Sequence, residues 1–443
     1  MTTHSEQARQ WVHVGSAGFA FLLRGLTWWQ AAALAATALV FNLVVLPHIG
    51  GRRLYRPVDE ARGFPLGILL YPLSVLLLIL IFSTRLDIVA AAWGILAFGD
   101  GMATLVGRRI GGPLWPWNHE KTIAGTIAFA VCGGIGAVAL AVWTRPAVVP
   151  LPSWRFELVA PLAAALVAAL VETIPVRLDD NVSVPATAGL VLWLASLVTP
   201  AALDASERAI VAALPWAIGG NLAVAWLGYR AGTVSLSGAI AGALIGIAIY
   251  AGGGRNAWVL LLVTFATASV ASRMGLKRKV LLGIEEERGG RRGAGNAVAN
   301  CGIATIAALV ASATPHSTPA LVALVAALTA GGSDTVASEI GKAWGRSTFL
   351  VTTLGRVKPG TPGAMSLEGT AAGLLAAFGL AALAVALGLV ARSMIVPVVV
   401  GATAGALLES VFAATLEGRG VLNNDTLNFI NTAVAAAVAL AIA

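Results

Sequence analysis

Long apolar stretches separated by short polar segments run through the whole chain. A helix that crosses a bilayer needs about 20 mostly apolar residues, and fewer where it is broken or buried in protein. On this criterion the pattern predicts about fourteen membrane-spanning helices. They cover residues 26–48, 65–83, 88–107, 123–143, 157–174, 184–202, 208–228, 237–251, 257–272, 295–313, 319–343, 369–391, 394–415 and 426–442. Residues 11–23 form a run too short to span, which predicts a helix at the membrane interface.

The composition also indicates an integral membrane protein. Hydrophobic residues make up 58% of the chain and charged residues only 11%, whereas soluble domains carry about 25% charged residues. The chain is therefore predicted to be an all-α polytopic integral membrane protein.

The positive charge is unevenly distributed. The formal net charge is +8, and the basic residues gather in loops after odd-numbered predicted helices. These residues are Arg52, Arg53, Arg56, Arg62, Arg108, Arg109, Lys121, Lys277, Arg278, Lys279, Arg288, Arg291, Arg292, Arg346, Arg356 and Lys358. An excess of Lys and Arg marks cytoplasmic loops. The pattern predicts a protein of the cytoplasmic membrane whose candidate sites face the cytoplasm, and it does not indicate nucleic-acid binding.

The sequence also matches itself. The motif Asp100-x-x-Ala103-x-x-x-Gly107 recurs as Asp334-x-x-Ala337-x-x-x-Gly341. Four other matches keep the same order: Gly50-Gly51-Arg52-Arg53 with Gly289-Gly290-Arg291-Arg292, Gly125-Thr126 with Gly369-Thr370, Glu172 with Glu409, and Asp180-Asn181 with Asn423-Asn424-Asp425. The shift equals eight predicted spans, an even number, so the two copies are predicted to be parallel repeats. We expect domains at 1–205 and 206–443, with 208–228 and 237–251 as linkers or lateral helices.

The first copy carries a pattern typical of phosphate chemistry. Asp100 is predicted near the cytoplasmic end of an apolar helix, where an ionised carboxylate needs a cation or water. Glycines and basic residues follow it, and backbone N–H groups at a helix start bind phosphates. A carboxylate beside such a loop indicates a Mg²⁺ site. The candidate catalytic residues are Asp100, Lys121, Glu172 and Asp180, and the candidate phosphate-binding residues are Arg108, Arg109, Thr122, Gly125, Thr126 and Asn181.

The second copy repeats this combination. Asp334 is the predicted metal ligand, as Asp100 is in the first copy. The candidate catalytic residues are Asp334, Glu339, Lys358 and Glu409, and the candidate phosphate-binding residues are Arg291, Arg292, Gly360, Thr361, Gly369, Thr370 and Asn424.

With these motifs in place, the first half resembles the CTP-dependent polyprenol kinases, which include dolichol kinase and phytol kinase and are related to phosphatidate cytidylyltransferase. The resemblance rests on Gly99 to Arg109, on Asn118 to Gly125, and on Glu172 with Asp179 to Pro185. The family usually has Lys-Ser where this chain has Lys121-Thr122, which keeps the hydroxyl.

The second half resembles a different membrane family, of the DUF92 type, which includes the plant phytyl-phosphate kinase. The matching residues are Gly290 to Asn300, Ser333 to Gly341, Lys358 to Gly363, and Leu408 to Ser410. Together the two resemblances imply a fusion that acts in two consecutive steps. The first half would phosphorylate a long-chain isoprenoid alcohol, and the second would convert the monophosphate to the diphosphate, with CTP as donor and Mg²⁺ as cofactor.

Three alternatives stay open at this point. A cytidylyltransferase forming a CDP-lipid would release pyrophosphate where a kinase releases CDP. A transporter would also suit internal repeats and intramembrane charges. One half could also serve only as structure. The sequence leaves open CTP against ATP, the prenol chain length, the oligomeric state and any direct transfer between sites.

Overall fold

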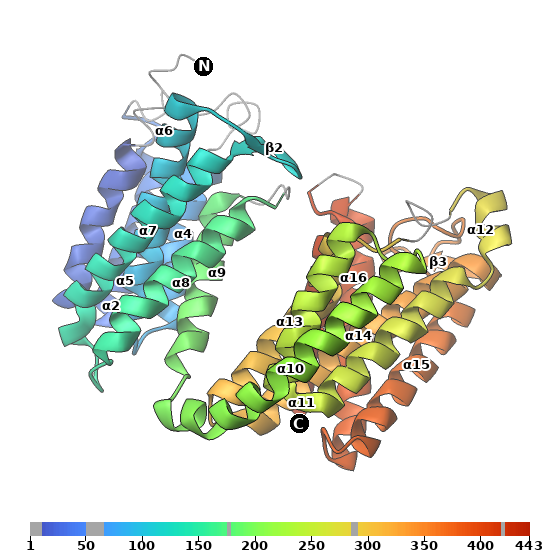
Figure 1. Cartoon of the computed structure of the whole chain (residues 1–443). Coiled ribbons are helices and arrows are strands. Elements are labelled where there is room, and N and C mark those ends of the chain that lie inside the picture. Colours follow the sequence, from blue (N-terminus) through green and yellow to red (C-terminus); the bar gives the residue numbers. More distant parts are fainter. Residues whose placement is uncertain (1–10, 50–65, 175–178, 285–290, 418–420) are drawn as a thin grey trace. The chain divides into compact units, whose positions relative to one another are not determined.

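The computed structural model describes residues 11–49, 66–174, 179–284, 291–417 and 421–443. Its contacts divide the chain into two compact units, Met1–Ser196 and Leu197–Ala443. Each unit is a bundle of helices with one short antiparallel hairpin (Figure 1). The all-α membrane class predicted from the apolar pattern is confirmed.

Unit 1 is built around a buried central helix. Its elements are η1 (Ser16–Arg24), α2 (Trp28–Val40), η2 (Phe41–Val45), α4 (Leu66–Ile81), α5 (Leu86–Gly94), η4 (Ile95–Asp100), α6 (Gly101–Ile110), β1 (Leu114–Trp115), β2 (Asn118–Thr122), α7 (Ile123–Thr144), η5 (Arg145–Ala147), α8 (Trp154–Glu172) and α9 (Asp180–Ser196). Every residue of α5 is buried, and α7, α9 and η1 pack against it. The π-helical turn η4 joins α5 to α6 within one span, Leu86–Ile110. Such turns are frequent at functional sites, and Asp100 is the last residue of this one.

Residues 11–23 are helical, and their place at the membrane interface stays a prediction. Ala17, Ala20 and Leu23 of η1 are buried and belong to the core of unit 1. Their spacing of three residues matches the period of a 3₁₀ helix, so they form one face. Two of the three are alanines, and small residues let helices approach closely in membranes. This face packs on α5.

Unit 2 is also built around one helix. Its elements are α10 (Pro200–Arg230), α11 (Leu236–Arg273), α12 (Leu276–Leu282), α13 (Ala294–Ala313), α14 (Ser317–Trp344), β3 (Thr348–Leu350), β4 (Ala364–Ser366), α15 (Leu367–Ala386), η7 (Arg392–Met394), α16 (Ile395–Phe412), η8 (Ala413–Glu417) and α17 (Asn424–Ile442). The central helix is α14, which is buried continuously from Val322 to Ser333. It packs against α11, α13, α15, α16 and α17.

The helix α11 consists of two antiparallel spans. Gly254, in its middle, has φ 80° and ψ 176°, which is not a helical conformation. Both ends of α11 meet the same residue: the Ser235 N–H donates to the Arg292 carbonyl, and the Arg292 guanidinium reaches the Ser272 hydroxyl. A straight helix of this length would separate its ends by about 57 Å. The chain therefore reverses at Gly254, a φ that glycine adopts without strain.

The predicted spans agree with these helices. By length and apolarity, 11 described helices can cross a membrane, with α11 counted once and the shorter apolar helix Leu66–Ile81 counted separately. Each predicted span overlaps one of the described helices or one arm of α11. Of the two alternatives for 208–228 and 237–251, the structure agrees with lateral packing helices, because α10 and α11 pack against each other and against α13 within unit 2. The predicted repeat match at Gly50-Gly51-Arg52-Arg53 lies outside the described residues.

Candidate active sites

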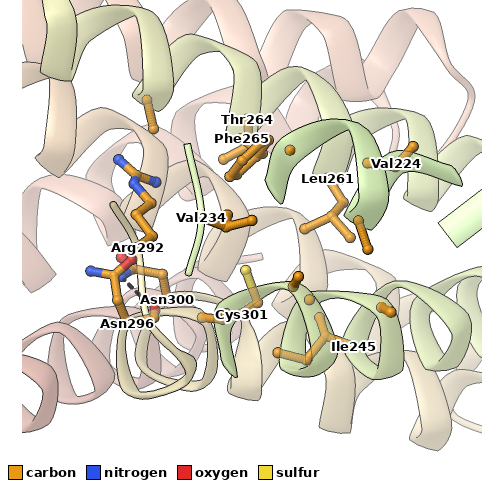
Figure 2. Close-up of a pocket in the computed structure, with 18 of the residues that line it drawn as sticks. Val224, Val234, Ile245, Leu261, Thr264, Phe265, Arg292, Asn296, Asn300 and Cys301 are labelled. Atoms are coloured by element: carbon orange, nitrogen blue, oxygen red, sulfur yellow. Dashed lines mark hydrogen bonds between the residues drawn. The ribbon is translucent and has the colours of Figure 1, made fainter. Parts of the chain in front are cut away.

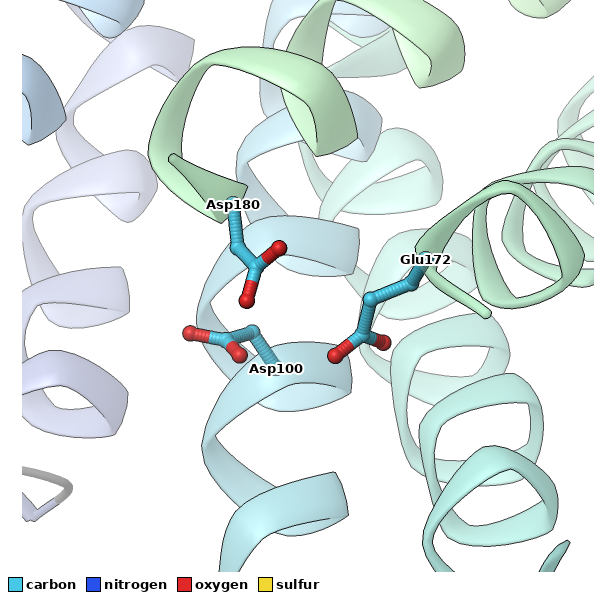
Figure 3. Close-up of side chains that lie close together, drawn as sticks. All are labelled: Asp100, Glu172 and Asp180. Carbon is cyan, nitrogen blue, oxygen red and sulfur yellow. The ribbon is translucent and has the colours of Figure 1, made fainter. Parts of the chain in front are cut away.

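Three carboxylates from separate helices converge in unit 1. Asp100 ends η4, Glu172 ends α8 and Asp180 begins α9. One oxygen from each lies within 4.8 Å of the others (Figure 3). Sequence reasoning placed these residues on one face by the parity of the spans, and the structure brings their side chains together.

Lys121 lies beside this cluster. Its Nζ is 2.5 Å from Glu172 Oε1 and 3.2 Å from Asp180 Oδ2. Burial alone would lower the pKa of Lys121, but the charges of Glu172 and Asp180 outweigh it and hold that pKa above its ordinary value. Lys121 is therefore a stable cation at neutral pH.

The hairpin that carries Lys121 is fastened to the end of α8. Trp117 Nε1 donates to the Thr173 hydroxyl at 3.1 Å, and Asn118 Nδ2 donates to the Thr173 carbonyl at 3.0 Å. Thr173 directly follows Glu172, so these two hydrogen bonds fix Lys121 against the carboxylates.

His13 also lies beside the cluster, and Tyr71 contacts His13. His13 Nε2 lies 3.7 Å from Asp100 Oδ2 and 3.1 Å from the Leu96 carbonyl. The rings of His13 and Tyr71 meet edge to face with centroids 4.6 Å apart. Sequence reasoning missed both residues. His13 precedes the first predicted span and lies in no repeated motif, so no signal in the chain could have found it.

The net charge of the cluster fits a divalent cation. When all three carboxylates are ionised, one ammonium leaves an excess of two negative charges, and the Glu172 side chain is only 6% exposed. Burying such an excess without a counter-ion is costly. Carboxylate oxygens are the ligands that Mg²⁺ takes, and two ligands of one Mg²⁺ lie up to about 4.2 Å apart. Small side-chain movements within the 4.8 Å cluster would satisfy this geometry.

The predicted phosphate-binding residues of the first half do not join the cluster. Arg108 and Arg109 are exposed in the last turn of α6, about 12 Å along the helix from Asp100. The Thr122 hydroxyl caps α7 by accepting from the Gly125 N–H at 3.0 Å. Asn181 donates to Asp179 at 2.7 Å, and the Thr126 hydroxyl accepts from Trp115 at 2.9 Å.

Gly125 and Gly369 have the same structural role in the two units. A Cβ on Gly125 would lie 3.0 Å from the Ala103 carbonyl, and one on Gly369 would lie 2.5 Å from the Ala337 carbonyl. Both glycines therefore allow two helices to cross closely. The prediction that they approach phosphate has no support in this geometry, because a neighbouring helix fills the space. Thr370 is half-buried in the first turn of α15.

Unit 2 holds a second acidic site. Asp334 lies within α14, and Glu409 lies near the end of α16 and accepts from Asn431 Nδ2 at 2.8 Å. The two carboxylates are close enough to repel each other. Within the described part of the chain, Asn300 Oδ1 and Asn431 Oδ1 are buried without a hydrogen-bond partner. Buried acceptors of this kind indicate a missing donor or cation, and this oxygen-rich set suits the same class of metal ion.

Glu339 was predicted to belong to this second site, but its partners lie elsewhere. Its carboxylate is 1% exposed and pairs with the equally buried Lys279, and it also accepts from Lys342 Nζ at 2.9 Å. Five residues separate Glu339 from Asp334, which places the two side chains about 140° apart around the helix. Glu339 therefore joins α14 to α12.

The remaining candidates of the second half lie at the same end of unit 2. Lys358 is exposed in the loop between β3 and β4, and its carbonyl accepts from the Thr361 hydroxyl at 2.8 Å. Gly360 has φ 85° and packs against Ile284. Asn424 begins α17, where its carbonyl accepts from Asn428 at 2.9 Å.

The two arginines lie beside α10 and α11. The Arg291 guanidinium lies 3.7 Å from the position of a Cβ on Gly232, and Arg292 forms a bridge with Val234.

Helical bundles with carboxylates held between apolar helices define both units as parts of an integral membrane protein. A model of the family described as integral membrane protein DUF92 matches residues 220–436. An uncharacterized membrane protein of Synechocystis is 39% identical over 202 residues, which cover 45% of this chain and 78% of that protein. The chain therefore belongs to the DUF92 family of integral membrane proteins.

Two plant proteins are also similar. Protein VTE6, chloroplastic, of Arabidopsis thaliana is 36% identical over 214 residues, 47% of this chain and 64% of that protein. Probable phytol kinase 3, chloroplastic, of Glycine max is 37% identical over 127 residues, 28% of this chain and 40% of that protein. The chain thus spans less than two thirds of either plant protein. No solved structure matches the chain.

Proposed function

We propose that this protein is a bifunctional isoprenoid kinase. Unit 1 phosphorylates a long-chain prenol of the phytol or geranylgeraniol type, and unit 2 phosphorylates the resulting monophosphate. The observation that carries the proposal is the cluster of Asp100, Glu172 and Asp180 around Lys121. Similarity to plant proteins named as probable phytol kinases supports the substrate class, and the family of the second half supports a related lipid substrate.

The arrangement in unit 1 suits phosphoryl transfer, which depends mainly on positioning and on neutralising charge. Lys121 supplies a fixed positive charge for phosphate oxygens. Asp180 is 38% exposed and Glu172 only 6%, so Asp180 is the more accessible acceptor for the alcohol proton. Asp100, Glu172 and Asp180 would hold Mg²⁺, which when bound neutralises nucleotide phosphates.

Unit 2 faces a different task, because its substrate is already an anion. No alcohol of high pKa has to be deprotonated, and the main need is positive charge near the acceptor phosphate. Arg292 reaches Ser272 at the end of α11, and the loop that carries Lys358 meets Ile284, which follows α12. Asp334 and Glu409, with the amide oxygens of Asn300 and Asn431, would hold the metal.

The products of the labelled nucleotide test this function. Purified protein would receive geranylgeraniol or phytol, Mg²⁺ and CTP, with ATP in a parallel reaction. Lipid-dependent release of CDP, together with prenyl mono- and diphosphate, is the expected result. Lipid-dependent pyrophosphate with a CDP-lipid would show cytidylyl transfer instead. Turnover of neither kind would contradict the kinase and leave transport as the function to assay in vesicles.

We further propose a cytoplasmic membrane location with both sites facing the cytoplasm. The basic loops support this orientation through the positive-inside rule. A cysteine placed at exposed Lys358 should react with an impermeant maleimide only when the cytoplasmic face is accessible. Labelling from the opposite face would contradict the orientation.

A further inference from the structure

Unit 2 contains an apolar cavity with one polar end. Its empty volume is ≈ 910 Å³, including the part open to the outside. Side chains and backbone of α10, α11, α13 and α14 line it. Arg292, Asn296 and Asn300 lie together at one end, whereas Val224, Leu261 and Ile245 lie toward the other (Figure 2).

The polar end lies against the acidic site of unit 2. Gly331 and Gly332 line the cavity, and they precede Asp334 by less than one helical turn. A Cβ on Gly331 would lie 2.9 Å from Asn300 Oδ1, so α13 and α14 touch at this level. A molecule with its charged group at Arg292 and its body in the cavity would therefore place that charge next to the predicted metal site.

We infer that this cavity holds the isoprenoid tail of an anionic prenyl monophosphate, with the phosphate at Arg292. The inference rests on the proposed function and names the substrate-binding part of the second site. The mostly apolar lining gives a hydrocarbon tail a favourable environment. A nucleotide does not suit it, because a ribose and base need hydrogen-bonding partners along their length and most of the lining is apolar. Asn221 also lines the cavity, but its amide already bonds the Ala217 carbonyl and Trp258 Nε1.

Small residues on α11 create the space. Gly238, Ala239, Gly242 and Ala243 all line the cavity. Ser235 lies at the polar end of the cavity, and Gly242 is about 10 Å from it along α11. A Cβ on Gly242 would meet no atom within 4 Å, whereas one on Gly238 would collide with the Arg292 carbonyl. A large side chain at Gly242 would thus fill the cavity part-way down without disturbing the backbone around it.

The first test locates the tail directly in the wild-type protein. Geranylgeranyl monophosphate with a diazirine at the tail end would be photolysed with the full chain in nanodiscs, and labelled peptides mapped by mass spectrometry. Labels on α10, α11 and α13 are expected, and unlabelled geranylgeranyl monophosphate should displace the probe. Labels confined to lipid-facing side chains or to unit 1 would overturn the inference. Equal displacement by phosphatidic acid would also overturn it, because the cavity would then bind membrane lipids without regard to tail chemistry.

The second test changes the length of the cavity. Gly242→Leu should raise the KM for geranylgeranyl monophosphate about tenfold or more and leave geranyl monophosphate less affected. Gly379→Leu is the matched control, because Gly379 is exposed on α15 and a Cβ there also meets no atom within 4 Å. An unchanged KM and chain preference in Gly242→Leu would contradict the inference while leaving the kinase intact. Photolabelling needs no turnover, so tail labelling without any diphosphate would contradict the proposed function and support the cavity.

Discussion

Replacing Lys121 by methionine tests how the unit 1 cluster is held together. The substitution removes the ammonium and keeps most of the side-chain volume. Three carboxylates then remain, without the cation that lies 2.5 Å from Glu172 and 3.2 Å from Asp180. We expect both prenol phosphorylation and stability to fall.

The size of the effect follows from burial. The Glu172 side chain is 6% exposed, and breaking a buried ion pair costs about 3–5 kcal/mol. Asp180 is 38% exposed, so its contact adds only about 0.2–1 kcal/mol. Without Lys121 the carboxylates can bind protons or cations instead, which reduces the loss. We therefore expect the lower end of the range of about 3–5 kcal/mol, a decrease of about 3 kcal/mol in the free energy of unfolding. A loss of similar size in the transition state corresponds to about a hundredfold lower kcat/KM.

Two measurements check this prediction. The rate of prenol phosphorylation and the thermal unfolding of Lys121→Met would be compared with wild type and with Lys277→Met, which alters an exposed lysine of α12. Conversion of added monophosphate to diphosphate should persist in Lys121→Met, because Lys121 belongs to unit 1. A kcat/KM within threefold of wild type, with unchanged unfolding, would refute the assignment of Lys121 to the cluster.

Three other predictions concern metal, packing and a buried ion pair. Chelation of Mg²⁺ should abolish both phosphorylation steps. Asp180→Asn should weaken Mn²⁺ binding, measured by electron paramagnetic resonance. Binding equal to that of wild type would exclude Asp180 as a metal ligand. Gly369→Ala places a Cβ 2.5 Å from a carbonyl of α14 and should destabilise the protein by about 1–3 kcal/mol, whereas Gly379→Ala should be neutral in the same unfolding assay. Lys279→Met leaves Glu339, 1% exposed, paired with Lys342 but without its buried partner. An unfolding free energy about 3 kcal/mol lower is expected, and an unchanged value would show that this pair contributes nothing.

Much of the fold could be predicted because apolar length is a direct consequence of the bilayer. Even the division of α11 into two spans was visible in the sequence, since Gly252, Gly253 and Gly254 interrupt an apolar run. The convergence of Asp100, Glu172 and Asp180 followed from counting which helix ends share a side of the membrane. That reasoning gives the depth of a residue in the membrane, but it does not say in which direction around the helix its side chain points.

The errors in the candidate sites have two causes: the sequence does not show in which direction a side chain points, and it does not show which distant residue it contacts. Glu339 lies on the same helix as Asp334, yet it points to Lys279, and nothing in the spacing of the two acidic residues reveals that partner. Gly125 was chosen from the sequence because the glycine–threonine pair recurs, but in the structure it allows α6 and α7 to lie close together. His13 reaches Asp100 only because η1, which follows it in the chain, folds against α5.

The division of labour between the two units is tested most directly by one comparison. Purified wild type, Asp100→Asn and Asp334→Asn would each receive geranylgeraniol, CTP and Mg²⁺, and the prenyl mono- and diphosphate formed would be quantified. We predict that wild type makes diphosphate, that Asp100→Asn makes neither product from the alcohol but still converts added monophosphate, and that Asp334→Asn stops at monophosphate. If Asp334→Asn makes diphosphate as wild type does, or if Asp100→Asn phosphorylates the alcohol normally, the two-site account is contradicted.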